Sequence, residues 1–199
     1  MAKPDSKAIF SRLGYKQKQT ELDEAHRKKI NSWIAEAASL IELKGITLEC
    51  SFDIFDKDQG KIVINTGAEK REITSSSFYK FIYGAKRILL MGITCGKNIM
   101  ELIEKEQKDN MTKAVVFDAA AGEIADSGLD YIVSFYNKEL IRKSEKLFAK
   151  RFSPGYGDLS LTTQKLFYDL LDMKKIGVEL SDSFMLIPQK SVIALTGIV

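Results

Sequence analysis

The sequence has 199 residues, of which 45% are hydrophobic, enough to fill the core of one domain. Its 30 basic and 27 acidic residues nearly balance, and the basic runs at 27–29 and 174–175 lie among acids, so we expect no nucleic-acid partner. One histidine, His26, and two cysteines, Cys50 and Cys95, are too few to hold a zinc or iron–sulfur site. They indicate a reduced cytosolic protein without disulfides, and no apolar run is long enough to span a membrane.

The first part of the chain predicts a helix followed by a hairpin. Residues 1–19 are polar and basic and are expected to run along the surface. Apolar residues recur at steps of three and four over 21–42, which predicts a helix. Residues 46–54 alternate apolar with polar, as in a strand with one wet face, and a turn at 56–60 leads into a returning strand at 61–65.

The middle of the chain combines a buried strand with helices. A serine N-cap predicts a short helix over 75–81. The continuous apolar run at 87–94 predicts a buried strand, with helices after it at 99–106 and 112–135. The first half of the last helix, 114–125, is rich in alanine and glycine, so another backbone or a ligand can approach it closely.

The last third contains an irregular segment. Proline and glycine predict a loop at 151–158, and a helix follows at 161–173. Two strands are expected at 183–187 and 191–195, joined through 188–190. Strands and helices mix without regular alternation, so we expect an α+β fold in a single domain spanning the whole chain.

The loop is the most distinctive feature. The run Arg-Phe-Ser-Pro-Gly-Tyr-Gly-Asp at 151–158 resembles the S-adenosylmethionine-binding loop of the reactivation domain of cobalamin-dependent methionine synthase, in its free-standing short form. Similar segments occur at Leu13-Gly14-Tyr15, at 118–123, at 176–185 and at 188–192. The resemblance therefore covers most of the chain.

The resemblance implies a fold and a task. The fold is a twisted antiparallel sheet flanked by helices. The task is to present S-adenosylmethionine to an inactive cob(II)alamin while a donor such as flavodoxin supplies one electron. A free-standing domain would act on a separate methionine synthase whose cobalamin-binding part holds the corrinoid. It would be an accessory component rather than a complete enzyme.

The resemblance also implies a ligand site. Arg151 offers a planar fork for the carboxylate of the ligand, and Glu123 can approach its ammonium group. Pro154 and Gly155 would leave backbone groups of the loop free for the adenine or ribose, and Tyr156 has a ring for stacking and a hydroxyl for a hydrogen bond. Methyl transfer needs positioning rather than an acid or base, so we expect no catalytic residue and no protein-bound metal.

Plainer roles are open for the same residues. Arg151 can form an ordinary ion pair, Tyr156 can be a packing residue, and Glu123 can belong to a solvated helix face with Asp118 and Asp126. Asp158 is expected to cap the loop or the next helix, and Cys95 to lie in the core. The long enzymes contribute a further tyrosine and an N-terminal aspartate for which this sequence offers no matching position.

Two other functions stand beside the leading one. The chain can be a docking module for the corrinoid protein of another methyltransferase, without binding a methyl donor. It can also be a small-molecule enzyme that reuses the fold, which ranks last because the sequence offers no obvious nucleophile or base.

Overall fold

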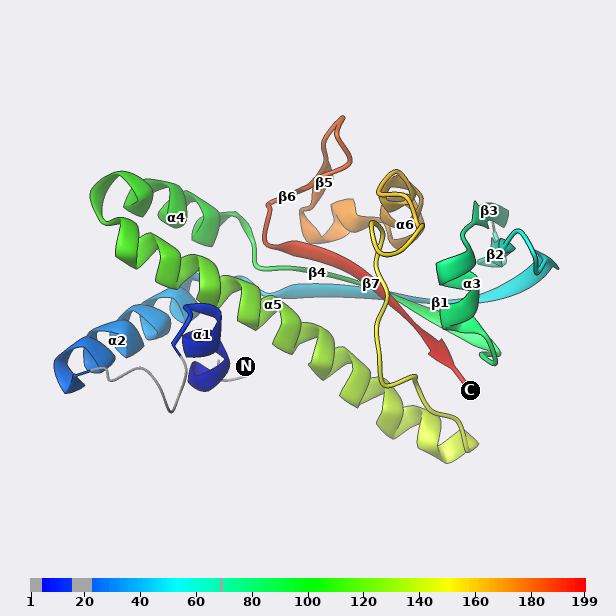
Figure 1. Cartoon of the computed structure of the whole chain (residues 1–199), viewed down its shortest axis with the longest axis horizontal. Helices are drawn as coiled ribbons and strands as arrows, with labels where there is room; N and C mark the ends of the chain where they lie inside the picture. Colours follow the sequence, from blue (N-terminus) through cyan, green and yellow to red (C-terminus); the bar gives the residue numbers. More distant parts are fainter. Residues whose placement is uncertain (1–4, 16–22, 69) are drawn as a thin grey trace.

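The computed structural model describes residues 5–15, 23–68 and 70–199. Within them, five antiparallel strands form a sheet with helices on both faces (Figure 1). The strands are β1 (Lys44–Asp56), β2 (Lys61–Asn65), β3 (Lys70–Thr74), β4 (Arg87–Thr94) and β7 (Ser191–Ile198). The helices are α1 (Ser6–Arg12), α2 (Glu24–Leu40), α3 (Ser76–Ile82), α4 (Lys97–Asp109), α5 (Met111–Leu140) and α6 (Thr163–Leu171), with 3₁₀ turns η1 (Ile141–Lys143) and η2 (Met173–Ile176). Strands β5 (Glu179–Leu180) and β6 (Leu186–Ile187) pair with each other, apart from the main sheet.

The strand order β3-β2-β1-β4-β7 depends on the length of β1. Its first half, residues 44–50, pairs with β4, and its second half, from Ser51 onward, pairs with β2. The predicted hairpin of β1 and β2 is thus confirmed. The α+β class that the sequence predicts is confirmed as well.

Strand β4 is buried on both faces of the sheet, which explains its unbroken apolar run. Leu89, Met91 and Ile93 point into a cluster with α1, α2, α4 and α5. Ile88 and Leu90 point into a second cluster with α3, α6 and η2. The sheet therefore separates two apolar cores, and the predicted strand at 87–94 is confirmed with its ends unchanged.

Helix α5 is about 45 Å long for its 30 residues and crosses the sheet diagonally (Figure 1). Its small residues allow the close approach that the sequence predicts. Ala120, Ala121 and Ala125 are buried. A Cβ atom added to Gly128 would lie 2.1 Å from Cδ1 of Ile93, so glycine lets this part of α5 lie against β4.

The N-terminal segment contains more structure than its polar composition predicts. Residues 6–12 form α1, which begins at the N-cap Asp5 and buries Ile9 completely. The neighbouring Phe10, Leu13 and Tyr15 pack on the same core. The rest of the segment expected along the surface, at 1–4 and 16–19, lies outside the described residues.

Three further elements differ from the prediction. Strand β3 was not expected, because Ile73 is its one buried apolar residue. The strand expected at 183–187 is reduced to the two residues of β6. The helix expected at 161–173 is shorter, since Asp172 adopts a left-handed conformation that ends α6.

Candidate functional site

The loop at 151–158, which we call the 151–158 loop, is fixed at both ends. At its start, Phe152 and Leu195 of β7 exchange two backbone hydrogen bonds of 2.9 and 2.8 Å. The ring of Phe152 packs between those of Phe78 and Phe81 on α3. Phe152 is half-buried, and Pro154 is buried. The start of the loop is therefore part of the core rather than a free surface turn.

The end of the 151–158 loop is fixed by Asp158. Its carboxylate accepts hydrogen bonds from the hydroxyl of Ser75 and from the backbone N–H groups of Ser76 and Ser77, both at 2.9 Å. These bonds, with the one from Ser75 first, hold the pKa of Asp158 well below its usual range. The expected capping role is confirmed in kind, but the capped helix is α3, which precedes the loop by many residues, and not the next helix α6.

Inside the loop, two N–H groups are already used. The N–H of Gly155 donates to the carbonyl of Leu159 at 2.8 Å, and that of Tyr156 donates to the carbonyl of Ser153 at 3.2 Å. We expected backbone groups of the loop to be free for a ligand, and these two N–H groups are not, so a ligand would bind through other loop atoms. Tyr156 itself is 65% exposed, and its ring lies 6.2 Å from that of Phe152.

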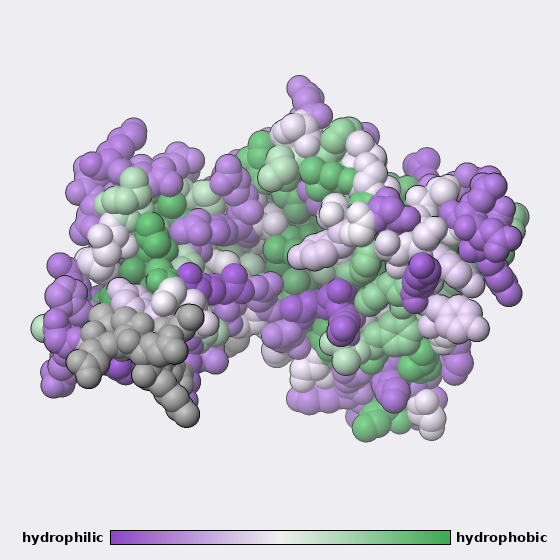
Figure 2. Space-filling model, in the orientation of Figure 1, coloured by the Kyte–Doolittle hydropathy of each residue, from purple (hydrophilic) through white to green (hydrophobic). Residues whose placement is uncertain are grey.

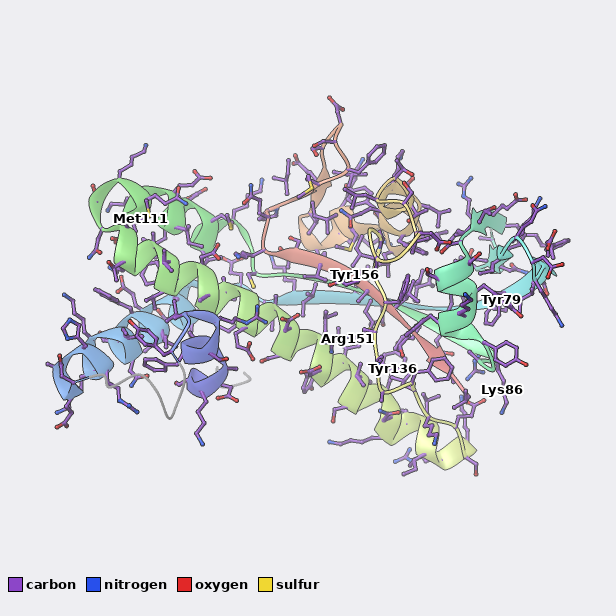
Figure 3. The ribbon with its side chains drawn as sticks, in the orientation of Figure 1. Tyr79, Lys86, Met111, Tyr136, Arg151 and Tyr156 are labelled. Atoms are coloured by element: carbon purple, nitrogen blue, oxygen red, sulfur yellow. The ribbon has the colours of Figure 1, made fainter. Side chains whose placement is uncertain are left out.

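Arg151 points from the loop to α5, where its guanidinium pairs with Asp130 (Figure 3). The Arg151 side chain is 27% exposed and the Asp130 side chain 71% exposed. The pair is thus accessible to a ligand. Tyr156 lies farther along the same stretch of chain, in front of β7 (Figure 3).

Glu123 lies on the same face of α5 as Asp130, two helical turns or about 10 Å away along the axis. It does not contact Arg151. Its Oε2 accepts a hydrogen bond of 2.8 Å from Nε of Arg12 on α1, and a second nitrogen of Arg12 pairs with Asp126. The structure therefore places Glu123 and Arg151 on one surface, but each is already bound to another residue.

These pairs form a row of charges along α5. Lys190, just before β7, extends the row through its ion pair of 2.8 Å with Asp118. Figure 2 shows this face of the molecule hollowed at its centre, with apolar residues in the hollow and hydrophilic residues along its lower border. In the same orientation, Figure 1 shows the 151–158 loop passing in front of β7, with α5 running diagonally across the sheet. We call the surface formed by the 151–158 loop, by the acidic residues Asp118, Glu123, Asp126 and Asp130 of α5, and by their partners Arg12 and Lys190 the α5–loop face.

Two clefts lie elsewhere. One, of about 610 Å³, is lined by apolar residues of α5 and β1, including Tyr131, Phe135 and Tyr136. The other, of about 820 Å³, is bordered by α6 and the β5–β6 hairpin. Neither cleft includes any of the five residues proposed to contact the ligand. At the α5–loop face, the structure offers charged side chains that would hold a ligand, notably Arg151, Glu123 and Asp126.

Both cysteines of the chain are buried. Burial raises the pKa of both the Cys50 and the Cys95 thiols to about 11. Cys95 lies in the core, as the sequence predicts, with its thiol 3.3 Å from the carbonyl of Ala121. Residues 5–15, 23–68 and 70–199 contain no group of three or more His, Cys, Asp or Glu side chains that could hold a metal ion.

The architecture has a known counterpart. A crystal structure of the MetH reactivation domain bound to AdoHcy superposes with a TM-score of 0.68 and 16% sequence identity. The match covers 98% of this chain and 73% of the other. The fold is that of the MetH reactivation domain. The twisted antiparallel sheet flanked by helices, which the resemblance of the 151–158 loop implied, is thereby confirmed.

Comparison by sequence alone does not identify a family for this chain. No protein-family model matches the sequence, and no curated protein matches it either. At 16% identity, the likeness to the MetH reactivation domain establishes the fold, and the ligand site has to be argued from the residues.

Sequence reasoning did not find two members of the α5–loop face, Arg12 and Asp130. Asp130 could have been found, because Glu123, Asp126 and Asp130 follow the spacing of three and four that puts acids on one side of a helix. Arg12 could not, because it lies 111 residues from Glu123 and no local pattern joins them.

No helix among the described residues combines the length and the apolar character that crossing a bilayer requires.

Proposed function

We propose that this chain binds S-adenosylmethionine on the α5–loop face and supports reductive methylation of cob(II)alamin on a separate methionine synthase. The observation that carries the proposal is the position of Arg151. The specific motif at 151–158 directs this arginine at the acidic face of α5, so a cation for a carboxylate and carboxylates for an ammonium group lie side by side.

The geometry suits an amino-acid group. The α-carboxylate of the ligand would take the place of Asp130 on Arg151, in the fork geometry that guanidinium and carboxylate prefer. The α-ammonium would lie one turn farther along α5, near Asp126, with Glu123 on the turn beyond it. Neighbouring turns of the helix are about 5 Å apart. The α-carboxylate and the α-ammonium of the ligand are attached to the same carbon, and they can reach side chains on neighbouring turns through their hydrogen bonds.

The loop would hold the other end of the ligand. Tyr156 is exposed at the loop tip and can stack on the adenine. Phe152 packs against α3 and Asp158 caps it, so these two residues fix the loop, while Pro154 and Gly155 would form the turn that presents loop backbone groups to the ligand. The protein would contribute positioning, which by itself can supply a large part of a rate acceleration.

The chemistry of the step is a displacement at the methyl group of the sulfonium. The methyl would pass to the cobalt of a corrinoid held by the partner, one electron would come from a donor such as flavodoxin, and S-adenosylhomocysteine would remain. The exposure of Asp130 and Tyr156 agrees with this task, because the methyl group has to be accessible to a second protein.

Isothermal titration with S-adenosylmethionine tests the proposal. We expect heat of binding with the native chain and at least a tenfold loss of affinity for Arg151→Ala, because a charge-assisted pair is lost. Arg142→Ala is a matched control, since Arg142 is 78% exposed near the far end of α5. Equal binding by the native chain and Arg151→Ala would refute the assignment of the site.

One observation favours a second function. Glu123 and Arg151 already have partners within the chain, as they would in a docking module for the corrinoid protein of another methyltransferase that binds no methyl donor. Such a module would bind a corrinoid protein with the same affinity in the presence and absence of S-adenosylmethionine. The proposed reactivation factor would methylate cob(II)alamin on that protein when the ligand and a reductant are added.

A further inference from the structure

Arg12 occupies the carboxylates that a cationic ligand would need. It comes from α1, far away in the sequence, and its guanidinium bonds both Glu123 and Asp126. The Glu123 side chain is only 15% exposed, so its carboxylate requires a cation nearby. The hydrogen bond to Glu123 raises the pKa of Arg12 further above its usual value, so Arg12 carries the positive charge that Glu123 needs.

We propose that Arg12 is a built-in competitor for the ammonium group of the ligand and sets the affinity of the α5–loop face. This inference rests on the proposed function. The guanidinium and an ammonium group would form hydrogen bonds with the same oxygens, so both cannot be bound there together. Each ligand molecule that binds must displace the Arg12 side chain.

The displacement needs a movement of the side chain only. Arg12 is 42% exposed, so its guanidinium can turn into solvent without meeting the core. Helix α1 can stay in place, because Ile9 is fully buried and anchors it. The Arg12–Asp126 pair is exposed on both sides, so its loss costs little free energy. At the less exposed Glu123, the ammonium group of the ligand would replace the cation that leaves, which makes the exchange reversible.

The test is the affinity of Arg12→Gln for two probes, S-adenosylmethionine and S-adenosylhomocysteine. Both carry the same ammonium group, but only the first carries a sulfonium. We expect the variant to bind both about fivefold more tightly than the native chain, since the competing ion pairs are gone. The affinity of Arg12→Lys should lie between that of the native chain and that of Arg12→Gln, because the ammonium of lysine bonds fewer acceptors than a guanidinium.

Controls separate this effect from others. Arg142→Gln makes the same change of net charge at an exposed site and should leave both affinities unchanged. Circular dichroism and thermal unfolding establish that each variant is folded. If Arg12→Gln does not fold, Arg12→Lys still carries the test, because it keeps a cation beside Glu123.

The outcomes are distinct. Weaker or equal binding of both probes by Arg12→Gln would overturn the inference, because Arg12 would then position the carboxylates or contact the ligand. Tighter binding of S-adenosylmethionine alone would also overturn it, because the sulfonium and not the ammonium would then lie at Glu123. If no form of the chain binds either probe, the proposed function fails, and the inference fails with it.

Discussion

Asp158 and Ser75, 83 residues apart, join the 151–158 loop to helix α3. The Ser75 hydroxyl donates to the Asp158 carboxylate and accepts a hydrogen bond of 3.0 Å from the N–H of Phe78. The Asp158 carboxylate also accepts from the first N–H groups of the helix. Free N–H groups at a helix N-terminus favour a negative charge, so the cap fixes the loop and the helix together.

This cap predicts a dependence of stability on pH. The folded pKa of Asp158 is lowered, chiefly by the Ser75 hydroxyl, whereas the unfolded pKa is about 4. A lowered folded pKa stabilises the fold above the unfolded value, and this stabilisation is lost as the pH falls through the folded value. We expect Asp158→Asn to lower the urea midpoint at pH 7 and the difference from the native chain to shrink below about pH 4.

Urea unfolding from pH 7 to pH 2 measures this difference. Asp53→Asn removes an exposed carboxylate from β1 and provides the control for a loss of charge alone. A difference between Asp158→Asn and the native chain that stays constant down to pH 2 would contradict the prediction.

A second prediction concerns the two glycines of the loop. Both have positive φ, +88° at Gly155 and +58° at Gly157. A Cβ atom at Gly155 would meet only Cδ1 of Leu161, at 3.7 Å, whereas one at Gly157 would lie 2.5 Å from Oγ and 2.6 Å from Cβ of Ser77. We expect Gly155→Ala to lower the free energy of unfolding by about 1 kcal/mol. Gly157→Ala should lower it by at least about 2 kcal/mol.

A double-mutant cycle in urea identifies the cause. Ser77→Gly removes both atoms that a new Cβ at Gly157 would meet. The combined variant should therefore lose less stability than the sum of the two single changes. Additive losses would show that the backbone conformation of Gly157, and not its contact with α3, determines the effect.

The elements that could be predicted from the sequence are those with repeated apolar positions. Strand β4 has apolar residues throughout because it is buried on both faces, and α2 has a regular stripe. Strand β3 and helix α1 could not be predicted, because neither has repeated apolar positions. Each has a single buried apolar residue, Ile73 in β3 and Ile9 in α1. Their positions depend on tertiary contacts that no short window of sequence contains.

The residues of the candidate site also divide into those that the sequence motif indicates and those that only the fold reveals. The motif identifies Arg151 and Tyr156 because they belong to one continuous loop. The partners of Arg151 and Glu123 come from other elements, Asp130 on α5 and Arg12 on α1. The spacing of acids on α5 indicates that Asp130 lies on the acidic face, but only the folded chain reveals which residues pair. Pro154 is buried, which shows a structural role, and its expected place near the ligand stays a prediction.

A third prediction concerns the partner of Arg151. Asp130→Asn keeps the size of the side chain but removes the charge that competes with a ligand carboxylate. We expect affinity for S-adenosylmethionine to rise about threefold, and stability to change by less than about 1 kcal/mol, because the Asp130 side chain is 71% exposed. Titration calorimetry and urea unfolding measure the two quantities.

The control for Asp130→Asn is Asp169→Asn. Asp169 also forms an exposed ion pair, at 2.8 Å with Lys165, but on α6. Asp169→Asn should leave the affinity for S-adenosylmethionine unchanged. Weaker binding by Asp130→Asn would mean that Asp130 contacts the ligand directly instead of competing with it.

The last prediction separates α1 from the rest of the fold. Ile9→Ala leaves a cavity that costs about 2–4 kcal/mol at a fully buried site. A helix of seven residues cannot persist without such packing. We therefore expect α1 to detach locally, with fast hydrogen exchange over residues 6–12 and with Arg12 lost from Glu123. Ligand affinity should then rise as it does in Arg12→Gln.

Hydrogen exchange followed by mass spectrometry gives the answer for each helix separately. Ser11→Ala changes an exposed position of α1 and should leave exchange over residues 6–12 slow. If Ile9→Ala also accelerates exchange throughout α4 and α5, then α1 is an integral part of the core beneath it. The competing arginine would in that case be fixed by the whole helical layer, and only its side chain could move when a ligand binds.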